Sequence, residues 1–168
     1  WLSRRAGEEV LGIEQFRLGH DYGSSQDHSR IIRLSYDEPN YTALAPHAFI
    51  HWQEAEAESG LQLVQRTGSI IFGPDDVEPD NIVRSYILAM HQEGIPFAIL
   101  DPREAMHRYP QFRFIDGDLI LYSAHDGFVD ARKANATHIA LARQRGAEVL
   151  ENTAVQRIRP LANGVELE

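Results

Sequence analysis

The chain has 168 residues, 43% of them hydrophobic, and a formal net charge of -9 at pH 7. This composition is typical of one or two small soluble domains, and the acidic charge argues against a general affinity for nucleic acid or anionic membranes. The absence of cysteine excludes disulfides, thiolate metal sites and a cysteine nucleophile within this stretch. No apolar run is long enough for a membrane span. We therefore expect a cytoplasmic protein whose partners include neither nucleic acid nor a membrane.

The first residues predict the last turns of a helix followed by a buried strand. WLSRRAG ends at Gly7, which suits a helix C-cap, and VLGIE is an apolar run that ends at Glu14. The chain begins without methionine, and its last residues, GAEVLENTAVQRIRPLANGVELE, predict strand, turn and strand. We therefore expect the chain to be a piece of a larger protein.

A long amphipathic helix is predicted over residues 39–60. Leu44, Phe49 and Trp52 fall on one side of this helix, which we expect to face the core. The end of the helix is strongly acidic and predicts a face exposed to solvent. Three residues form this acidic face: Glu54, Glu56 and Glu58.

Strands and helices then follow one another, which predicts an α/β fold. Asp101 and Glu104 form a capping-box pattern, in which the Asp101 side chain accepts a hydrogen bond from the amide of Glu104. Gly94 and Gly146 mark the ends of two helices. The predicted elements are strands at 61–65, 69–73, 97–100 and 118–123, and helices at 79–93, 101–109 and 129–146.

Glu14 is the first candidate for a binding residue. In a dinucleotide-binding βαβ unit, the second strand ends in an acid whose carboxylate accepts hydrogen bonds from the adenosine ribose. Glu14 ends a strand that follows a helix and a glycine, which is that position. The glycine-rich loop of such a unit is missing, because no G-x-G occurs in the chain. On spacing alone, the alternative is an ordinary solvated acid at the end of a strand.

Two arginines, Arg30 and Arg33, lie in the apolar part of GSSQDHSRIIRLSY, which spans residues 23–36. A guanidinium group presents a planar fork of donors that suits a carboxylate, so these arginines predict a local anion site. If SRIIR is helical, the two arginines share a face and Ile31 and Ile32 pack inward. The alternative is an arginine pair that bridges to Asp or Glu on an acidic protein.

Other chemically active residue types give weaker signals. His47 and His51 are four apart, a spacing zinc can use, but no third ligand and no H-E-x-x-H glutamate is present, so we expect no metal. His125 and Asp126 precede Gly127 and predict a structural turn rather than a site. No G-x-S-x-G elbow and no P-loop occurs.

Four stretches, taken in order, resemble one family. IEQF, GSSQDHSRIIRLSY, RTGSIIFGP and HDGFVDARKANATHIALARQRGAEVLENTAVQRI are similar to the monomeric sarcosine oxidase and N-methyltryptophan oxidase group of the D-amino-acid-oxidase-like flavoproteins. The similarity covers essentially the whole chain. It implies an FAD-dependent enzyme that oxidises a small-molecule substrate, an N-methyl or other secondary amino acid, with molecular oxygen as acceptor and hydrogen peroxide as product.

The resemblance also implies roles for individual residues. Arg33 resembles the arginine that pairs with the substrate carboxylate, and Arg30 resembles the arginine that lies against the flavin near the reaction centre. Glu14 resembles the acid that binds the adenosine ribose of FAD, and Val155 the valine whose backbone contacts the adenine. Three serines complete the expected cofactor site: Ser24, Ser25 and Ser29, the last beside the isoalloxazine.

The implied fold is an FAD-binding, Rossmann-like domain of the glutathione-reductase type with an inserted mixed-sheet substrate domain. Residues 1–66 and 126–168 are expected in the FAD-binding part, and residues 67–125 in the substrate-binding part. Composition does not mark these boundaries. Ser25 stands where sarcosine-specific enzymes often carry a histidine near the flavin, so the exact substrate stays open.

Two classes of function remain at this point. The favoured one is an FAD-dependent amine oxidase, with a neighbouring subfamily, such as oxidases of fructosyl amino acids or pipecolate, as a variant. The rival is a truncated module that binds a nucleotide or a partner without redox chemistry. A G-x-G-x-x-G shortly before Trp1 would favour the flavoprotein. In either case we expect the 168-residue chain by itself to be inactive.

Overall fold

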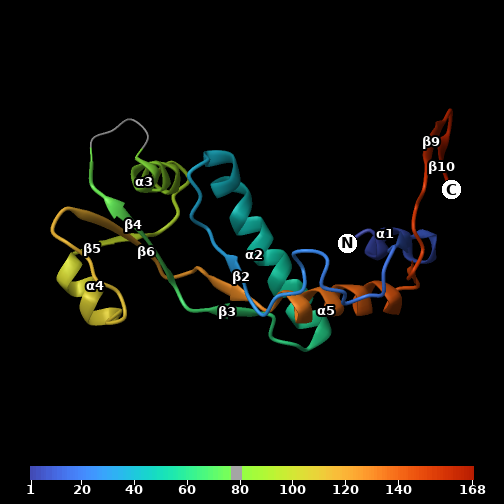
Figure 1. Cartoon of the computed structure of the whole chain (residues 1–168), viewed down its shortest axis with the longest axis horizontal. Coiled ribbons are helices and arrows are strands. Elements are labelled where there is room, and N and C mark those ends of the chain that lie inside the picture. The colour runs from blue at the N-terminus through green and yellow to red at the C-terminus, as the bar shows by residue number, and fades with distance from the viewer. Residues whose placement is uncertain (77–80) are drawn as a thin grey trace. The chain divides into compact units, whose positions relative to one another are not determined.

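The computed structural model describes residues 1–76 and 81–168. Helices and strands are mixed along the chain, so the α/β prediction is confirmed. The chain divides into two compact units, and Figure 1 shows its helices and strands. The first unit comprises Trp1–His28 and Asp130–Glu168, and the second unit comprises Ser29–Val129. Each unit contains its own sheets.

The first unit is built on one pair of parallel strands. β1 (Leu11–Ile13) pairs with β8 (Glu148–Leu150), and the helix α5 (Ala131–Gln144) leads into β8. The short helix α1 (Ser3–Ala6) and the 3-10 helix η1 (Gly7–Glu9) precede β1. Parallel strands need a long connection, and here α5 brings the chain back to enter β8 in the same direction as β1.

The end of the chain forms an antiparallel hairpin within the first unit. β9 (Ile158–Leu161) pairs with β10 (Gly164–Leu167). A salt bridge of 2.8 Å joins Arg159 and Glu166 across the hairpin. All residues of both strands are exposed, so the hairpin adds no buried core to this unit.

The first sheet of the second unit has three antiparallel strands. Its central strand is β7 (Gly127–Val129), with β2 (Arg30–Ile32) on one edge and β3 (Val64–Arg66) on the other. The helix α2 (Pro39–Ser59) connects β2 to β3. The last strand of the unit in sequence therefore lies between two strands that come much earlier.

The second sheet of this unit is also antiparallel. β6 (Asp118–Ser123) lies between β4 (Ser69–Pro74) and β5 (Ala98–Leu100). The helices are α3 (Ile82–Gln92) and α4 (Pro102–Arg108). The predicted helix over 79–93 is confirmed from residue 82, and its positions 79 and 80 lie outside the described residues.

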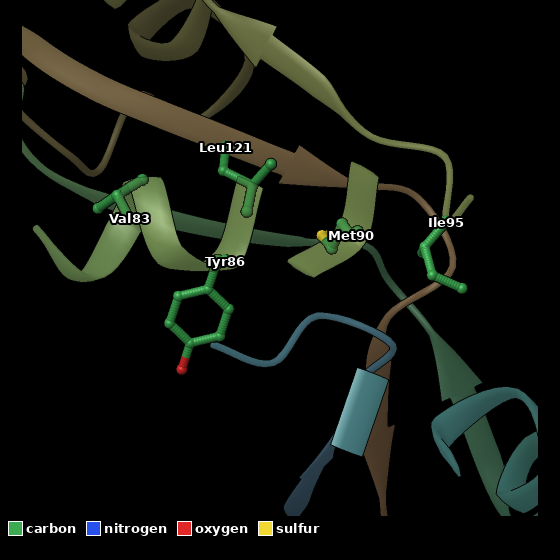
Figure 2. Close-up of a cluster of buried hydrophobic side chains, with 5 residues drawn as sticks. All are labelled: Val83, Tyr86, Met90, Ile95 and Leu121. Carbon is green, nitrogen blue, oxygen red and sulfur yellow. The ribbon is translucent and has the colours of Figure 1, made fainter. Parts of the chain in front are cut away.

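Apolar side chains of α3 form one core cluster with the second sheet. Figure 2 shows this cluster, with α3 lying beside β6. A smaller cluster holds α2 against the first sheet through Phe49, Ile32 and Val64. The cluster at α3 consists of Val83, Tyr86, Met90, Ile95 and Leu121.

The predicted helix ends are confirmed by their capping geometry. Asp101 accepts hydrogen bonds from the backbone N–H groups of Arg103, at 2.8 Å, and Glu104, at 3.4 Å. Asp130 starts α5 in the same way, by accepting from the N–H of Lys133 at 2.9 Å. The glycines predicted to end helices all have positive φ: Gly7 (51°), Gly94 (66°) and Gly146 (91°).

Within the stretch SRIIR, Arg30–Ile32 form the strand β2, so the helical arrangement considered for this stretch is wrong. Side chains alternate across a strand. Ile32 is accordingly buried at 9% exposure, whereas Ile31 is 74% exposed and does not pack inward. The physical reason is tertiary, because the backbone from Arg30 to Ile32 pairs with β7.

Two expectations about α2 also need correction. Glu56 is half-buried, and its Oε1 accepts hydrogen bonds from the N–H groups of Leu63, at 2.7 Å, and Val64, at 2.8 Å. It therefore fixes the entry to β3 instead of belonging to a solvated face. Leu44 is 61% exposed, although Phe49 and Trp52 on the same side are covered in whole or in part.

The predicted functional domains do not coincide with the two compact units. The compact units divide after His28 and after Val129. The boundaries expected near residues 66 and 126 fall instead where the chain passes between the two sheets of the second unit, from β3 to β4 and from β6 to β7. The assignment of 67–125 to a substrate-binding part stays a prediction.

Candidate functional site

Glu14 follows β1 directly and continues its pairing. Its N–H donates to the carbonyl oxygen of Leu150 at 2.9 Å, and its own carbonyl oxygen accepts from the N–H of Thr153 at 2.9 Å. The acid is therefore fixed at the carboxyl end of the parallel pair. In open parallel sheets, ligands bind outside this end of the strands.

The carboxylate of Glu14 is held by its own loop. Its Oε1 accepts the N–H of Phe16 at 2.9 Å and lies 3.5 Å from Nε2 of His20. The hydrogen bond from the Phe16 backbone is the main reason that the pKa of Glu14 is lowered from 4.5, and His20 adds to this effect. Hydrogen bonds to the charged form favour it, so Glu14 carries its charge at neutral pH.

His20 is a site residue that the sequence reasoning missed. Its Nδ1 accepts the N–H of Tyr22 at 3.1 Å, which leaves Nε2 to donate toward Glu14. The imidazole also contacts the Phe16 ring at a centroid distance of 5.2 Å. The loop after the strand mixes aromatic and polar residues, and a single histidine there belongs to no motif.

The other expected cofactor residues of the first unit lie in exposed segments. Val155 is 40% exposed and follows Thr153, whose N–H bonds to Glu14, so the structure brings this segment beside the acid. Ser24 and Ser25 lie in the exposed loop after Tyr22. Ser25 lines a pocket of about 360 Å³ together with residues of α5.

The second unit contains the remaining predicted residues, Ser29, Arg30 and Arg33. A pocket of about 360 Å³ lies between β2 and α2, and we call it the arginine pocket. Both arginines line it, while Ser29 is exposed at the start of β2. The rest of its wall consists of aliphatic and aromatic side chains, and the aromatic ones are Tyr36, Tyr41, Phe49 and Trp52.

The guanidinium of Arg33 lies against two tyrosine rings. Its carbon is 4.8 Å from the centroid of Tyr36 and 5.3 Å from that of Tyr86. The ring of Tyr86 projects from α3 toward the segment after β2 (Figure 2). Within residues 1–76 and 81–168 no acid pairs with Arg33, so the alternative of a salt-bridged arginine does not hold at this position. Stacking leaves the N–H groups of a guanidinium able to bind an anion.

Arg30 is held differently from Arg33. Its Nη1 donates to the carbonyl oxygen of Ser29 at 3.0 Å. As the first residue of β2, Arg30 pairs with Val129 of β7, and Arg33 follows the last residue of the strand. The structure thus brings both predicted arginines to the wall of one pocket.

The histidine pair on α2 lacks the surroundings of a metal centre. His51 lies 3.4 Å from Glu54, and both groups are substantially exposed. Over the described part of the chain, no group of three His, Cys, Asp or Glu side chains could hold a metal ion. Among these same residues, no helix has the length and apolar character needed to cross a membrane.

The residues present fit part of an FAD site. Glu14 offers one carboxylate oxygen, Oε1, that is fixed by the loop, and no hydrogen bond to its Oε2 occurs among the described residues, which leaves that oxygen for ribose hydroxyls. The arginine pocket combines fixed positive charge with aromatic walls, a combination that suits an amino acid carboxylate. No glycine-rich phosphate loop is present in the sequence.

Curated proteins similar to the chain are amino acid oxidases. Monomeric sarcosine oxidase of Streptomyces avermitilis is 31% identical over 168 residues, which cover 99% of this chain and 42% of that protein. N-methyl-L-tryptophan oxidase of Salmonella arizonae is 32% identical over 170 residues, which cover 100% of this chain and 45% of that protein. The chain thus spans less than half the length of these relatives.

Solved structures with the same fold include two enzymes. The amino acid oxidase NikD, in its open form, superposes with a TM-score of 0.82 at 22% identity, over 98% of this chain and 43% of that chain. L-proline dehydrogenase from P. horikoshii superposes with a TM-score of 0.80 at 23% identity, over 98% of this chain and 42% of that chain.

The family match covers nearly the whole sequence. The family described as FAD dependent oxidoreductase (DAO) matches residues 1–167. The resemblance drawn from the sequence motifs is therefore confirmed, and the expected cofactor, FAD, is the one that defines the family. The chain belongs to the DAO family of FAD-dependent oxidoreductases.

Proposed function

We propose that the protein carrying this chain oxidises the C–N bond of N-methyl or other secondary amino acids, such as sarcosine, with FAD as cofactor. Molecular oxygen is the electron acceptor in this proposal, and hydrogen peroxide is the product. The observation that carries it is the arginine pocket, where Arg33 presents a guanidinium with no acidic partner among the described residues. The names of the curated relatives support the substrate class.

Arg33 is the carboxylate-binding residue in this proposal. A guanidinium binds a carboxylate through two parallel hydrogen bonds, which fixes both the distance and the orientation of the substrate. Stacking between Tyr36 and Tyr86 limits the positions that the side chain can take. Binding the carboxylate in one orientation decides which carbon of the substrate is presented for oxidation.

Arg30 supplies positive charge at the same pocket. Bound FAD would accept a hydride equivalent from the carbon next to the amine nitrogen. The fixed charge of Arg30 then stabilises negative charge that develops during the reaction, because its position requires no rearrangement at that moment.

The proposal also assigns the residues that bind the cofactor. Glu14 binds the adenosine ribose, and the backbone at Val155 contacts the adenine. Three serines lie along the remainder of the cofactor: Ser24, Ser25 and Ser29. The division into an FAD-binding part, 1–66 with 126–168, and a substrate-binding part, 67–125, belongs to the same proposal, as does a location in the cytoplasm.

The test is Arg33→Lys in a full-length protein that carries this chain. A single ammonium replaces a bidentate fork, so KM for sarcosine or N-methyl-L-tryptophan should rise by about tenfold, as expected for a lost charged hydrogen bond. Steady-state peroxide release measures it. Arg108→Lys is the matched control, because Arg108 lies over the ring of Tyr122 at 5.7 Å and neither residue lines the arginine pocket.

Three outcomes would point elsewhere. Unchanged kinetics for Arg33→Lys would remove Arg33 from the substrate site. Turnover only with fructosyl amino acids or pipecolate would place the enzyme in a neighbouring subfamily. Retained FAD without oxidation of any amine would instead favour a module that binds a nucleotide or a partner without redox chemistry.

A further inference from the structure

Asp126 is a buried acid at the joint between the two sheets of the second unit. Its side chain is fully buried, and its Oδ1 accepts the N–H of Leu34 at 2.7 Å. Its Oδ2 accepts the hydroxyl groups of Ser35, at 2.8 Å, and Ser69, at 2.6 Å. Burying a carboxylate is costly unless it is fully hydrogen-bonded. Among the described residues, these three neutral donors are the only groups that bind the Asp126 carboxylate. They satisfy it without a counter-ion.

The backbone around Asp126 is equally constrained. Its carbonyl oxygen accepts from the N–H groups of Thr67, at 3.2 Å, and Gly68, at 2.9 Å. The next residue, Gly127, lies so close to β3 that a Cβ atom would meet the carbonyl oxygen of Gln65 at 1.9 Å. The turn expected at this position is therefore present. Through Asp126 it connects the segment at Leu34 and Ser35 with the segment from Thr67 to Ser69.

The segment that Asp126 holds is the one that carries Arg33. Leu34 and Ser35 directly follow the arginine, and both donate to the Asp126 carboxylate. On the other side of Arg33, the backbone pairs with β7 up to Ile32. The main chain is consequently fixed immediately before and immediately after the arginine, which restricts the direction of its side chain.

We propose that Asp126 is a positioning residue, whose buried carboxylate holds the segment after β2 so that the Arg33 guanidinium faces the arginine pocket. The inference rests on the proposed function, in which Arg33 binds the substrate carboxylate. Ser35 transmits the effect, because its hydroxyl belongs to the segment that follows the arginine. Ser69 binds the same oxygen from β4 and does not belong to that segment.

The test compares the loss of a hydrogen bond to Asp126 from the segment that follows Arg33 with the loss of one from β4. In a full-length protein that carries this chain, kcat/KM is measured for sarcosine or N-methyl-L-tryptophan, whichever is oxidised faster, and for its uncharged carboxamide. The ratio of the two values reports how well the enzyme recognises the carboxylate. The variants are Ser35→Ala, Ser69→Ala, Asp126→Asn and Arg33→Lys, each with its Tm.

Ser35→Ala and Asp126→Asn should lower the preference for the carboxylate by about tenfold, the effect of losing a hydrogen bond to a charged group. Ser69→Ala removes a donor from the same oxygen, so its Tm should fall as much as that of Ser35→Ala, yet its preference should stay within about twofold of the wild type. In the Asp126→Asn/Arg33→Lys double variant the losses should not add, because both changes act on one interaction.

The outcomes separate this inference from the proposed function. If Arg33→Lys lowers the carboxylate preference while Ser35→Ala and Asp126→Asn leave it unchanged, the inference is overturned and the proposed function stands. Equal losses of preference in the two serine variants would make Asp126 a purely structural residue. If Arg33→Lys has no effect on the preference, both proposals fail.

Discussion

The orientations of Glu14 and Arg33 depend on a few contacts with neighbouring groups. Glu14 keeps one oxygen bound by the Phe16 N–H and His20, which leaves the other oxygen for a ligand. Arg33 is directed by two tyrosine rings and by the segment that Asp126 holds. In both cases the chemically active group lies at or just after the end of a strand, and neighbouring side chains limit its motion.

Glu14→Ala should weaken the retention of FAD by about tenfold in a full-length protein, because a charged hydrogen-bond acceptor for the ribose is lost. The KM for the amino acid should change little, since the residue acts on the cofactor. Fluorescence titration of the apoprotein with FAD measures the change. Glu9→Ala, an exposed acid on η1, is the control, and a variant that loses turnover while binding FAD normally would contradict the assignment.

The lowered pKa of Glu14 predicts how the stability of the protein depends on pH. A carboxyl group whose folded-state pKa is depressed stabilises the folded protein above its ordinary pKa, and that contribution is lost as pH falls through the lowered value. The lowering from 4.5 therefore predicts that the wild type and Glu14→Gln differ in Tm at neutral pH. This difference in Tm should shrink only below pH 4.5. A difference that already disappears near neutral pH would show that another group is titrating.

At the scale of elements, β7 organises the second unit. It pairs with β2 and β3 at the same three residues, so the strand that carries Arg30 depends on a partner almost a hundred residues later in the sequence. Gly127 begins β7 and allows β3 to approach closely. A side chain at this position would displace β3 or β7 and would disturb the arginine pocket with them.

Gly127→Ala should therefore destabilise the protein strongly, by more than about 3 kcal/mol, because the new methyl group overlaps the backbone of β3. The urea midpoint of unfolding measures this change in stability. Gly164→Ala is the matched control, since nothing lies within 4 Å of the added Cβ in the β9–β10 hairpin. A small effect at Gly127 would show that the two strands can separate without cost.

On the scale of the whole molecule, the first unit contains a parallel sheet of only two strands among the described residues. Parallel sheets are normally covered on both faces and contain more strands than this. Glu14 lies at the end of this sheet, and no G-x-G motif for a pyrophosphate occurs in the chain. In the proposed function, the chain thus supplies some contacts for FAD without the motif that binds its phosphates.

The 168-residue chain by itself should accordingly hold FAD weakly and show no oxidase activity. The phosphates of a dinucleotide normally bind to glycine-loop amides and a helix N-terminus, and an acidic chain offers them little else. The experiment is purification with excess FAD, removal of free cofactor by gel filtration, a visible spectrum and an assay of peroxide release from sarcosine. A stoichiometric flavin band with turnover would contradict the prediction.

The sequence by itself determined the local features of this protein. The ends of the helices at Gly7, Asp101 and Gly146 could be predicted, because capping depends on residues only a few positions apart. The strand before Glu14 could be predicted from a short apolar run, but its expected burial is wrong, since Leu11 is 52% exposed. The family could be recognised from motifs that are continuous in sequence.

Tertiary structure decided what those residues contact. Pairing with β7 made Arg30–Ile32 a strand and exposed Ile31, although the local sequence was compatible with a helix. The stacking of Arg33 on Tyr86 and the burial of Asp126 against Ser35 join residues far apart in sequence. Such contacts form only when separate segments pack together, and no local pattern encodes which segments will meet.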